Sequence, residues 1–357
     1  MTQTTEETTQ IPALTIGLDV GDRTTQLYAL NAAGQCVAER TIATTAAGLA
    51  VAFADVAWCR VVLEVGTHSP WMARQLLTLG HAVYVANPSA MYGARRRRKR
   101  NDRLDAEFLA RQGRADVQLL HAIQHRSATA AAHLELLRAR DHVVRTRTQL
   151  INHVRGSVKS TGARVPACGA DAFARRSAAA LPPALAPALT PLLATIAALT
   201  TTIAAYDAQI ATLIGEHYPV AQRLQQPAGV GPLTALAFVL LIDDPTRFVR
   251  SRDVGAYFGL VPRLDESSTQ TPQLRITKAG DPLARRLLVS AAHYILGPFG
   301  PPCDLRTYGT QLMVRGGGNA KKRAVIAVAR KLAVLLHHLW VQDVVYVPDL
   351  LARRRAA

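Results

Sequence analysis

The chain has 357 residues, 49% of them hydrophobic, and its 42 Lys and Arg residues against 25 Asp and Glu give a formal net charge of +17. That length suffices for two or three domains, and such an excess of positive charge favours a polyanionic partner, above all nucleic acid. A membrane protein and a disulfide-rich secreted scaffold are both disfavoured.

The longest apolar runs and the cysteines support these exclusions. Leu233–Ile242 is too short to span a bilayer, and Val325–Trp340 is interrupted by Arg330 and Lys331. No apolar secretion signal stands at the N-terminus. The four cysteines are scattered without a C-x-x-C pair, which predicts neither a zinc site nor disulfides. We therefore expect a cytoplasmic, bacterial-type protein associated with the nucleoid.

Strands alternate with helices in the first third of the chain, which predicts an α/β layer. A turn at Gly21-Asp22 makes the first two strands antiparallel. The strands are expected at Leu14–Val20, Thr25–Leu30, Val61–Val65 and His81–Val85, and the helices at Thr45–Ala54 and Pro70–Leu79.

Two apolar strands each contain one acid, Asp19 and Glu64. A carboxylate is costly there unless it is paired or metal-bound, and the alternative is a strand-end acid facing water. Asp102 and Asp105 follow on a predicted helix, three positions apart on one face. Four carboxylates converging at one sheet edge would suit two Mg²⁺ ions roughly 3.5–4 Å apart, which clamp the attacking and leaving oxygens of a phosphodiester.

A basic run leads directly into these helical acids. It consists of Arg95, Arg96, Arg97, Arg98, Lys99 and Arg100. Such a run would hold a polyanion, DNA or RNA, beside the metal, whereas the alternative is a solvated start of a helix.

Two long helices are predicted next, joined by a loop rich in Ala and Pro. Apolar residues recur at every seventh position from Ala130 to Val158, and from Leu189 to Leu213 they alternate gaps of three and four. Both patterns are typical of a coiled-coil seam. The helices either fold back on each other within one chain or form a subunit interface, and the sequence leaves both open.

A different composition begins near Pro227. Gly229-Val230-Gly231 opens an apolar helix, and it resembles a helix-hairpin-helix element in which the amides at Gly229 and Gly231 bind phosphate; a plain tight turn is the alternative. Further along, a loop is expected over Val261–Gln273, a helix from Asp281-Pro282 and a basic-headed helix over Lys321–Trp340.

Several long, ordered motifs between Ile16 and Trp340 resemble the transposases, or recombinases, of insertion-sequence family 110. The first part carries GLDVG, LEVGTHSPW, VANP and KRNDRLDAEFLAR. The second carries PAGVGPLTALAFVLLIDDPTRF, RDVGAYFGLVPR, QLRITKAGDP, SAAHYILGPFGP and NAKKRAVIAVARKLAVLLH. The resemblance implies an α/β RNase H-like (RuvC-like) DEDD domain, a helical coiled-coil insertion and a mainly α C-terminal transposase domain.

These parts predict the following domain boundaries. Residues 1–12 form a polar tail, 13–125 the RuvC-like domain, 126–220 the coiled-coil region, 221–345 the transposase domain and 346–357 a basic tail.

The resemblance also implies site residues. It assigns Asp19, Glu64, Asp102 and Asp105 to two Mg²⁺ ions, and the serine nucleophile to Ser267. Ser268 follows where the family usually has glycine, a departure that is either tolerated, or alters the nucleophile's loop, or impairs this copy. Arg275 and Lys278 are expected to hold the scissile phosphate, with ordinary surface placement as the alternative.

The implied partners are donor and target DNA, a noncoding bridge RNA that pairs with both, and further copies of the chain in a dimer or tetramer; no membrane is implied. Two other functions remain open. One is a Holliday-junction nuclease that uses only the acids, and the other is a nucleic-acid-binding protein whose carboxylates are structural.

Overall fold

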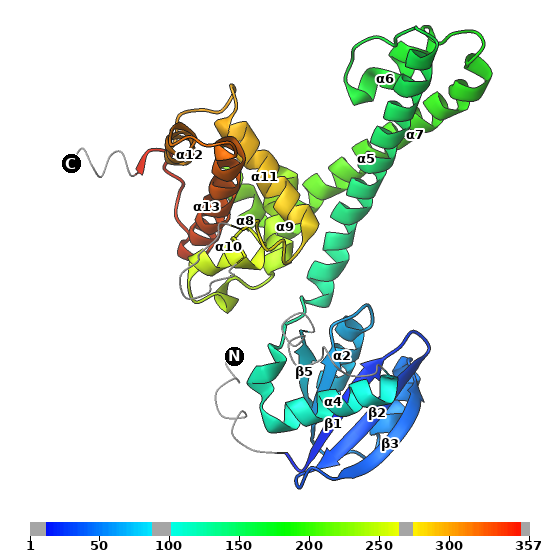
Figure 1. The fold of residues 1–357 in the computed structure, drawn as a ribbon, viewed down its shortest axis with the longest axis vertical. Helices are drawn as coiled ribbons and strands as arrows, with labels where there is room; N and C mark the ends of the chain where they lie inside the picture. The colour runs from blue at the N-terminus through cyan, green and yellow to red at the C-terminus, as the bar shows by residue number, and fades with distance from the viewer. Residues whose placement is uncertain (1–11, 88–100, 264–273, 351–357) are drawn as a thin grey trace. The chain divides into compact units, whose positions relative to one another are not determined.

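The computed structural model describes residues 12–87, 101–263 and 274–350. The chain divides into two compact units, Met1–His125 and Arg126–Ala357 (Figure 1). The basic run from Arg95 to Arg100 and the predicted nucleophile Ser267 lie outside the described residues.

A mixed five-stranded sheet in the order β3-β2-β1-β4-β5 forms the centre of the N-terminal unit. β1, β2 and β3 are antiparallel neighbours, whereas β4 and β5 run parallel to β1. The strands are β1 (Leu14–Val20), β2 (Thr24–Asn31), β3 (Cys36–Ala43), β4 (Arg60–Glu64) and β5 (Ala82–Ala86). The predicted α/β organisation is confirmed.

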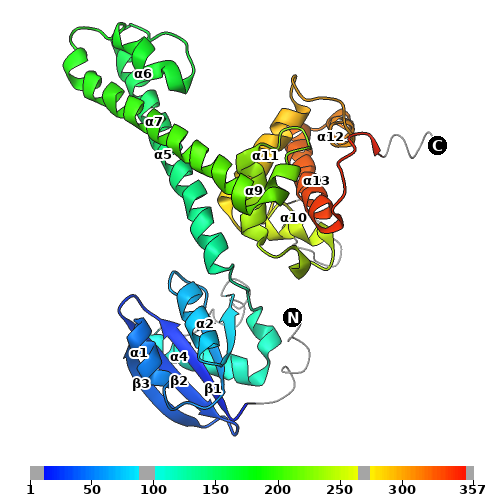
Figure 2. The ribbon, with the colours of Figure 1, turned by 180° about the vertical axis from the view of Figure 1, so that it is seen from behind.

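Helices cover both faces of this sheet (Figures 1 and 2). α1 (Ala46–Phe53) and α2 (Ser69–Thr78) pack on the face that carries Leu18 and Leu63. α4 (Asp102–Ala115) packs on the opposite face, and the short 3₁₀ helix η1 (Val117–Leu120) follows it. Because side chains alternate along a strand, the residues directly after Leu18 and Leu63 point to the α4 face.

Two long antiparallel helices, α5 (Ala128–Ser160) and α7 (Ala186–His217), begin the C-terminal unit (Figure 1). Apolar side chains of both helices pack together, among them Val154 and Ile196. The Arg140 guanidinium donates two hydrogen bonds to the Asp207 carboxylate, at 2.6 and 3.1 Å. The two helices therefore pair within one chain, while supercoiling remains a prediction. The connecting segment contains a helix that the sequence does not predict, α6 (Ala170–Ala178), which buries Phe173 against this pair.

The rest of the unit is a helical bundle around one apolar core. Its longer helices are α9 (Pro232–Ile242), α11 (Pro282–Leu296), α12 (Asp304–Val314) and α13 (Ala320–Gln342), and its short ones are α8 (Pro219–Arg223), α10 (Val254–Tyr257) and the 3₁₀ turns η2 (Pro245–Arg247) and η3 (Ser251–Asp253). α9 is buried from Thr234 to Ile242. Asp281 caps α11 by accepting hydrogen bonds from the amides of Leu283 and Ala284.

Among the residues that the structure describes, two helices meet the length and hydropathy expected of a membrane span. α7 and α13 have mean hydropathies of 1.7 and 1.6 in their most apolar windows. Half of that window in α13 is buried inside the unit, as in the core helix of a globular domain. α13 reaches this hydropathy although Arg330 and Lys331 interrupt its apolar run. Two such helices are weak evidence for a membrane.

Candidate active site

Asp19 and Glu64 stand side by side at the carboxyl ends of two neighbouring parallel strands. β1 and β4 are paired from Thr15 opposite Arg60 to Leu18 opposite Leu63, and the two acids are the next residues on each strand. Both point to the face that α4 covers. The register alone therefore places two carboxylates next to each other, as the sequence predicts.

Glycines bring α4 unusually close to this sheet. A Cβ on Gly17 would lie 2.1 Å from the carbonyl oxygen of Ala106, and a Cβ on Gly113 would lie 2.3 Å from Cγ2 of Val62. The helix backbone thus rests directly on β1. Because Asp105 immediately precedes Ala106, this contact holds its carboxylate near the end of β1.

The beginning of α4 is also fixed by its sequence. The Asn101 side chain accepts a hydrogen bond from the Arg103 amide at 2.8 Å and so caps the helix. Asp102 and Asp105 lie in the first turn, where negative charge interacts favourably with the helix dipole. Asp102 is exposed, whereas Asp105 is half-buried.

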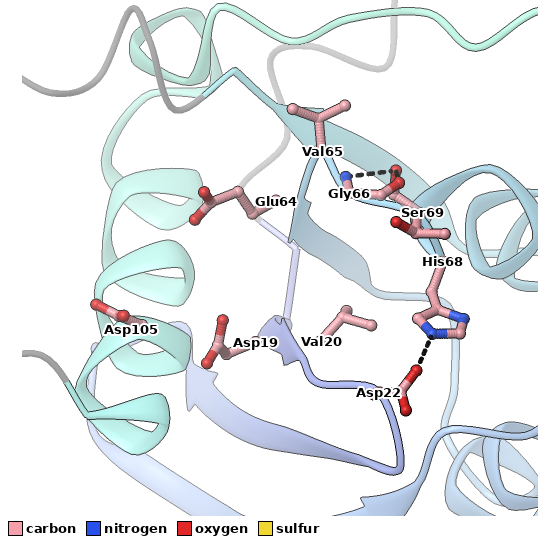
Figure 3. Close-up of a pocket in the computed structure, with 10 residues that line it drawn as sticks. Asp19, Val20, Asp22, Glu64, Val65, Gly66, His68, Ser69 and Asp105 are labelled. Carbon is pink, nitrogen blue, oxygen red and sulfur yellow. Dashed lines mark hydrogen bonds and ion pairs between the residues drawn. The ribbon is translucent and has the colours of Figure 1, made fainter. Parts of the chain in front are cut away.

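Asp19, Glu64 and Asp105 border a polar cavity of about 440 Å³. Its lining consists of Asp19, Val20, Asp22, Glu64, Val65, Gly66, Thr67, His68, Ser69 and Asp105. Figure 3 shows the carboxylates of Asp19, Glu64 and Asp105 around one space beside α4. Three of the four predicted acids are therefore brought together, and Asp102 is not among the lining residues.

The acids offer only oxygen donors, which suit a hard divalent cation such as Mg²⁺. Within the described ranges, no three His, Cys, Asp or Glu side chains form a cluster that would hold a metal ion by themselves. Magnesium, however, usually keeps several waters and takes one or two carboxylates together with substrate phosphates. The neighbouring pair Asp19 and Glu64 meets that smaller requirement, so the residues fit the ion.

The far wall of the cavity contains polar residues that the sequence does not identify as functional. Nδ1 of His68 accepts a hydrogen bond from the Trp71 indole at 3.1 Å, so its Nε2 carries the proton and donates to Asp22 at 3.4 Å (Figure 3). His68 thus borders the candidate site. Its position in the turn after an acid-ending strand was the available signal.

The turn after β4 is held by a buried serine. The Ser69 hydroxyl donates to the Gly66 carbonyl at 2.9 Å and accepts from the Gly66 amide at 3.0 Å. A third bond, at 2.9 Å, joins the hydroxyl to Nε2 of His125. Since the hydroxyl has one proton, His125 must donate. This network fixes the backbone just beyond Glu64.

The other predicted site residues that the structure describes lie in the C-terminal unit. Gly231 immediately precedes α9, as expected, and Gly229 has a φ of 82° and faces Ala291, whose carbonyl oxygen would lie 2.8 Å from an added Cβ. Close packing against α11 therefore explains this glycine, while phosphate binding by the turn remains a prediction. Arg275 and Lys278 are both exposed.

Comparisons with known proteins agree with these observations. The family model for the DEDD domain of IS110 transposases matches residues 16–162, and that for transposases of the IS116/IS110/IS902 family matches residues 221–303. The chain is 27% identical to the transposase for insertion sequence element IS1111A of Coxiella burnetii, over 93% of this chain and 90% of the relative. It is 27% identical to a probable family 20 transposase of Pseudomonas aeruginosa, over 93% of this chain and 98% of the relative. Identity to the transposase for insertion sequence element IS1328 of Yersinia enterocolitica is 28%, over 66% of this chain and 70% of the relative.

Proposed function

Because the chain belongs to the IS110 family of transposases, we propose that it cuts and rejoins DNA strands with an acidic metal site and a serine nucleophile. The observation that carries the proposal is the meeting of Asp19, Glu64 and Asp105 at one cavity. The strand order, with one acid at the end of each of two neighbouring parallel strands, supports an RNase H-like domain of the RuvC type.

We assign the acids to Mg²⁺, with Asp19 and Glu64 as the principal ligands and with Asp105 and Asp102 completing the tetrad. A bound ion would neutralise the phosphate and polarise the phosphorus–oxygen bond. The hydrogen bonds around Ser69 keep the end of β4 in place, so that Glu64 stays beside Asp19. Family membership implies cleavage and rejoining, and the cavity offers a place for the ion that such phosphoryl transfer needs.

We assign the attack on phosphorus to Ser267. A serine hydroxyl is a weak nucleophile at neutral pH and needs a base or a metal to activate it. In the proposed step its oxygen bonds to phosphorus, the bond to the leaving strand's oxygen breaks, and the hydroxyl proton passes to a base. The resulting phosphoserine conserves the bond energy, so a hydroxyl from another strand can displace the serine and join a new partner.

Donor and target DNA, a noncoding bridge RNA and a homo-oligomer complete the proposal. Base pairing with the RNA would read sequence, while the protein would bind backbone and duplex shape. The basic run from Arg95 to Arg100 and the net charge of +17 support a polyanionic partner of either kind.

The decisive experiment compares Ser267→Ala and Asp19→Asn with the wild type in a strand-exchange assay with Mg²⁺, while protein–DNA adducts are trapped by denaturation. We expect both variants to lose exchange by at least about 100-fold, because each removes a group that acts only in the reaction. The adduct should disappear in Ser267→Ala. Strand cleavage that persists in Ser267→Ala but stops in Asp19→Asn would instead indicate a nuclease that uses the acids alone. Full activity in Asp19→Asn would contradict the acidic site.

The bridge RNA is tested by sequencing nucleic acid that co-purifies with the protein. We expect one short species encoded beside the gene. Recovery of random cellular RNA would contradict guidance by a bridge RNA and would leave the strand-exchange proposal intact.

A further inference from the structure

A short antiparallel ladder joins the two ends of the segment that carries Ser267. Pro262 and Ile276 form an isolated antiparallel bridge, and the Arg263 amide donates to the Arg275 carbonyl at 3.0 Å. In this register Arg263 and Arg275 are directly opposite each other. Their side chains therefore leave the ladder on the same face.

Two arginines in this arrangement repel each other, because like charges directly opposite on paired strands are destabilising. Both side chains are exposed, and neither forms a hydrogen bond or an ion pair in the described part of the chain. Several other arginines of this unit pair with acids, as Arg140 does with Asp207. An anion between the two guanidinium groups would replace the repulsion by two charge-assisted interactions.

Lys278, three residues after Arg275, adds a third cation whose backbone is held rigidly. Lys278 has a φ of 57°, a conformation that costs energy for a residue other than glycine, and its amide donates to the Gly259 carbonyl at 3.2 Å. A Cβ on Gly259 would lie 2.3 Å from the Ala279 carbonyl oxygen, so the two backbones are in direct contact. Arg285 also donates to that carbonyl, at 2.8 Å. The packing thus holds Lys278 in its strained conformation.

We propose that Arg263, Arg275 and Lys278 form a phosphodiester clamp for the DNA backbone, in which the opposed arginine pair requires the anion. Arg263, the last residue of the motif RDVGAYFGLVPR, is the new member, because neither its residue type nor the resemblance assigns it a role. The inference rests on the proposed function, because it takes the anion to be the DNA substrate. Ser267 follows Arg263 by four residues in the sequence.

Charge reversal tests the clamp, because Arg263→Glu should act oppositely on stability and on binding. A carboxylate opposite Arg275 makes a favourable cross-strand pair, so the melting temperature of the full chain should rise or stay unchanged. Affinity for a fluorescein-labelled DNA duplex at low salt should fall by about tenfold or more, and the slope of log affinity against log salt should decrease by about one. The readouts are thermal unfolding and fluorescence anisotropy.

The matched control is Arg40→Glu, an equal charge change at an exposed position on the edge strand β3. It should change the salt slope by less than Arg263→Glu does. Equal slopes in both variants, or an Arg263→Glu protein that melts earlier than the wild type, would overturn the inference. If Ser267→Ala abolishes strand exchange while Arg263→Glu binds DNA normally, the clamp is wrong and the proposed function stands. If wild type exchanges no strands, the binding data still decide the clamp.

Lys278→Gly gives a second, independent test. Glycine adopts a positive φ without strain, so this variant should melt at a higher temperature than the wild type. Its DNA affinity should nevertheless fall, because a phosphate contact is lost. Unchanged affinity would remove Lys278 from the clamp.

Discussion

At the scale of single residues, burial of Cys59 and His81 gives the N-terminal unit a pH dependence. Cys59 Sγ and His81 Nδ1 are 3.4 Å apart, and both side chains are buried. Burial lowers the pKa of His81 below its ordinary 6.5, because its charged form is poorly solvated there. The unfolded chain therefore binds a proton more readily than the folded one, so stability present above about pH 6.5 is lost as the pH falls further.

Replacing this histidine tests that dependence. Between about pH 7.5 and 5.5 the melting temperature of the wild type should fall more steeply than that of His81→Leu, which has nothing to titrate at this position. Differential scanning fluorimetry at several pH values measures the difference, and the other histidines contribute equally to both proteins. Identical pH profiles of the two melting temperatures would show that protonation of His81 does not destabilise the folded protein.

The cysteines should differ in reactivity for the same reason. Burial raises the pKa of Cys59 to about 12, so at neutral pH its thiol is protonated as well as inaccessible. Cys36 is exposed. Iodoacetamide should therefore label Cys36 in the folded protein and Cys59 only after denaturation, as peptide mass spectrometry would reveal. Equal labelling in the folded state would contradict the packing around Cys59.

At the scale of helices and strands, the contact between α4 and β1 places Asp105 near Asp19. A methyl group on Gly17 would meet the Ala106 carbonyl at 2.1 Å, so Gly17→Ala must push the helix away. We expect a loss of about 2–3 kcal/mol in the free energy of unfolding. Strand exchange should fall as well, because Asp105 moves with the helix. Urea denaturation and the exchange assay provide the two measurements.

Gly156 offers a matched control for this substitution. It lies inside α5, and nothing within 4 Å would meet its Cβ. Gly156→Ala should therefore raise stability by about 0.5–1 kcal/mol, since alanine loses less backbone entropy in a helix. If Gly17→Ala is as well tolerated as Gly156→Ala, the close contact with α4 is not required.

Variants of Asp281, which caps α11, distinguish the contribution of its hydrogen bonds to stability from that of its charge. Asp281 accepts from the Leu283 amide at 2.7 Å and from the Arg138 guanidinium at 2.9 Å. Asp281→Ala should lower the free energy of unfolding by about 1–2 kcal/mol, whereas Asp281→Asn keeps a capping oxygen and should cost less. Urea denaturation gives both values. Equal losses would assign the effect to the ion pair with Arg138 instead.

How far the sequence predicts these elements depends on burial. The strands around Leu18 and Leu63 are predicted because both residues belong to continuous apolar runs. β3 is not predicted, because this edge strand is mostly exposed and its residues show no clear alternation. α6 is not predicted either, since it lies in a segment whose many Ala and Pro residues suggest a loop. For the site, the acids at the strand ends can be recognised in the sequence. His68 lines the cavity because of the path of the turn after β4, which the sequence does not reveal.

At the scale of the whole molecule, charge is unequally divided between the two units. Residues 126–357 contain 29 Lys and Arg against 14 Asp and Glu, a formal charge of +15, whereas residues 1–125 contain 13 against 11, a formal charge of +2. The unit with the acidic cavity is thus nearly neutral overall. Net positive charge is therefore concentrated in the other unit, while the basic run from Arg95 to Arg100 is a local concentration of positive charge in the first.

This division predicts how binding responds to salt. Affinity for a DNA duplex should fall steeply between about 50 and 200 mM salt, because binding releases counterions from the phosphates. Asp19→Asn, which alters the nearly neutral unit, should leave the slope unchanged. Fluorescence anisotropy across a salt series measures it. A slope that changes in Asp19→Asn as much as in Arg263→Glu would place the main electrostatic contact in the first unit.

The ladder at Pro262 and Ile276 has a consequence for how such proteins diversify. Because its two strands pair at residues 263 and 275, the ladder fixes the points at which the chain leaves the bundle and returns to it. Lengthening a closed loop costs little entropy. The sequence between these anchor points can therefore be replaced by one of another length while the paired strands keep the same scaffold.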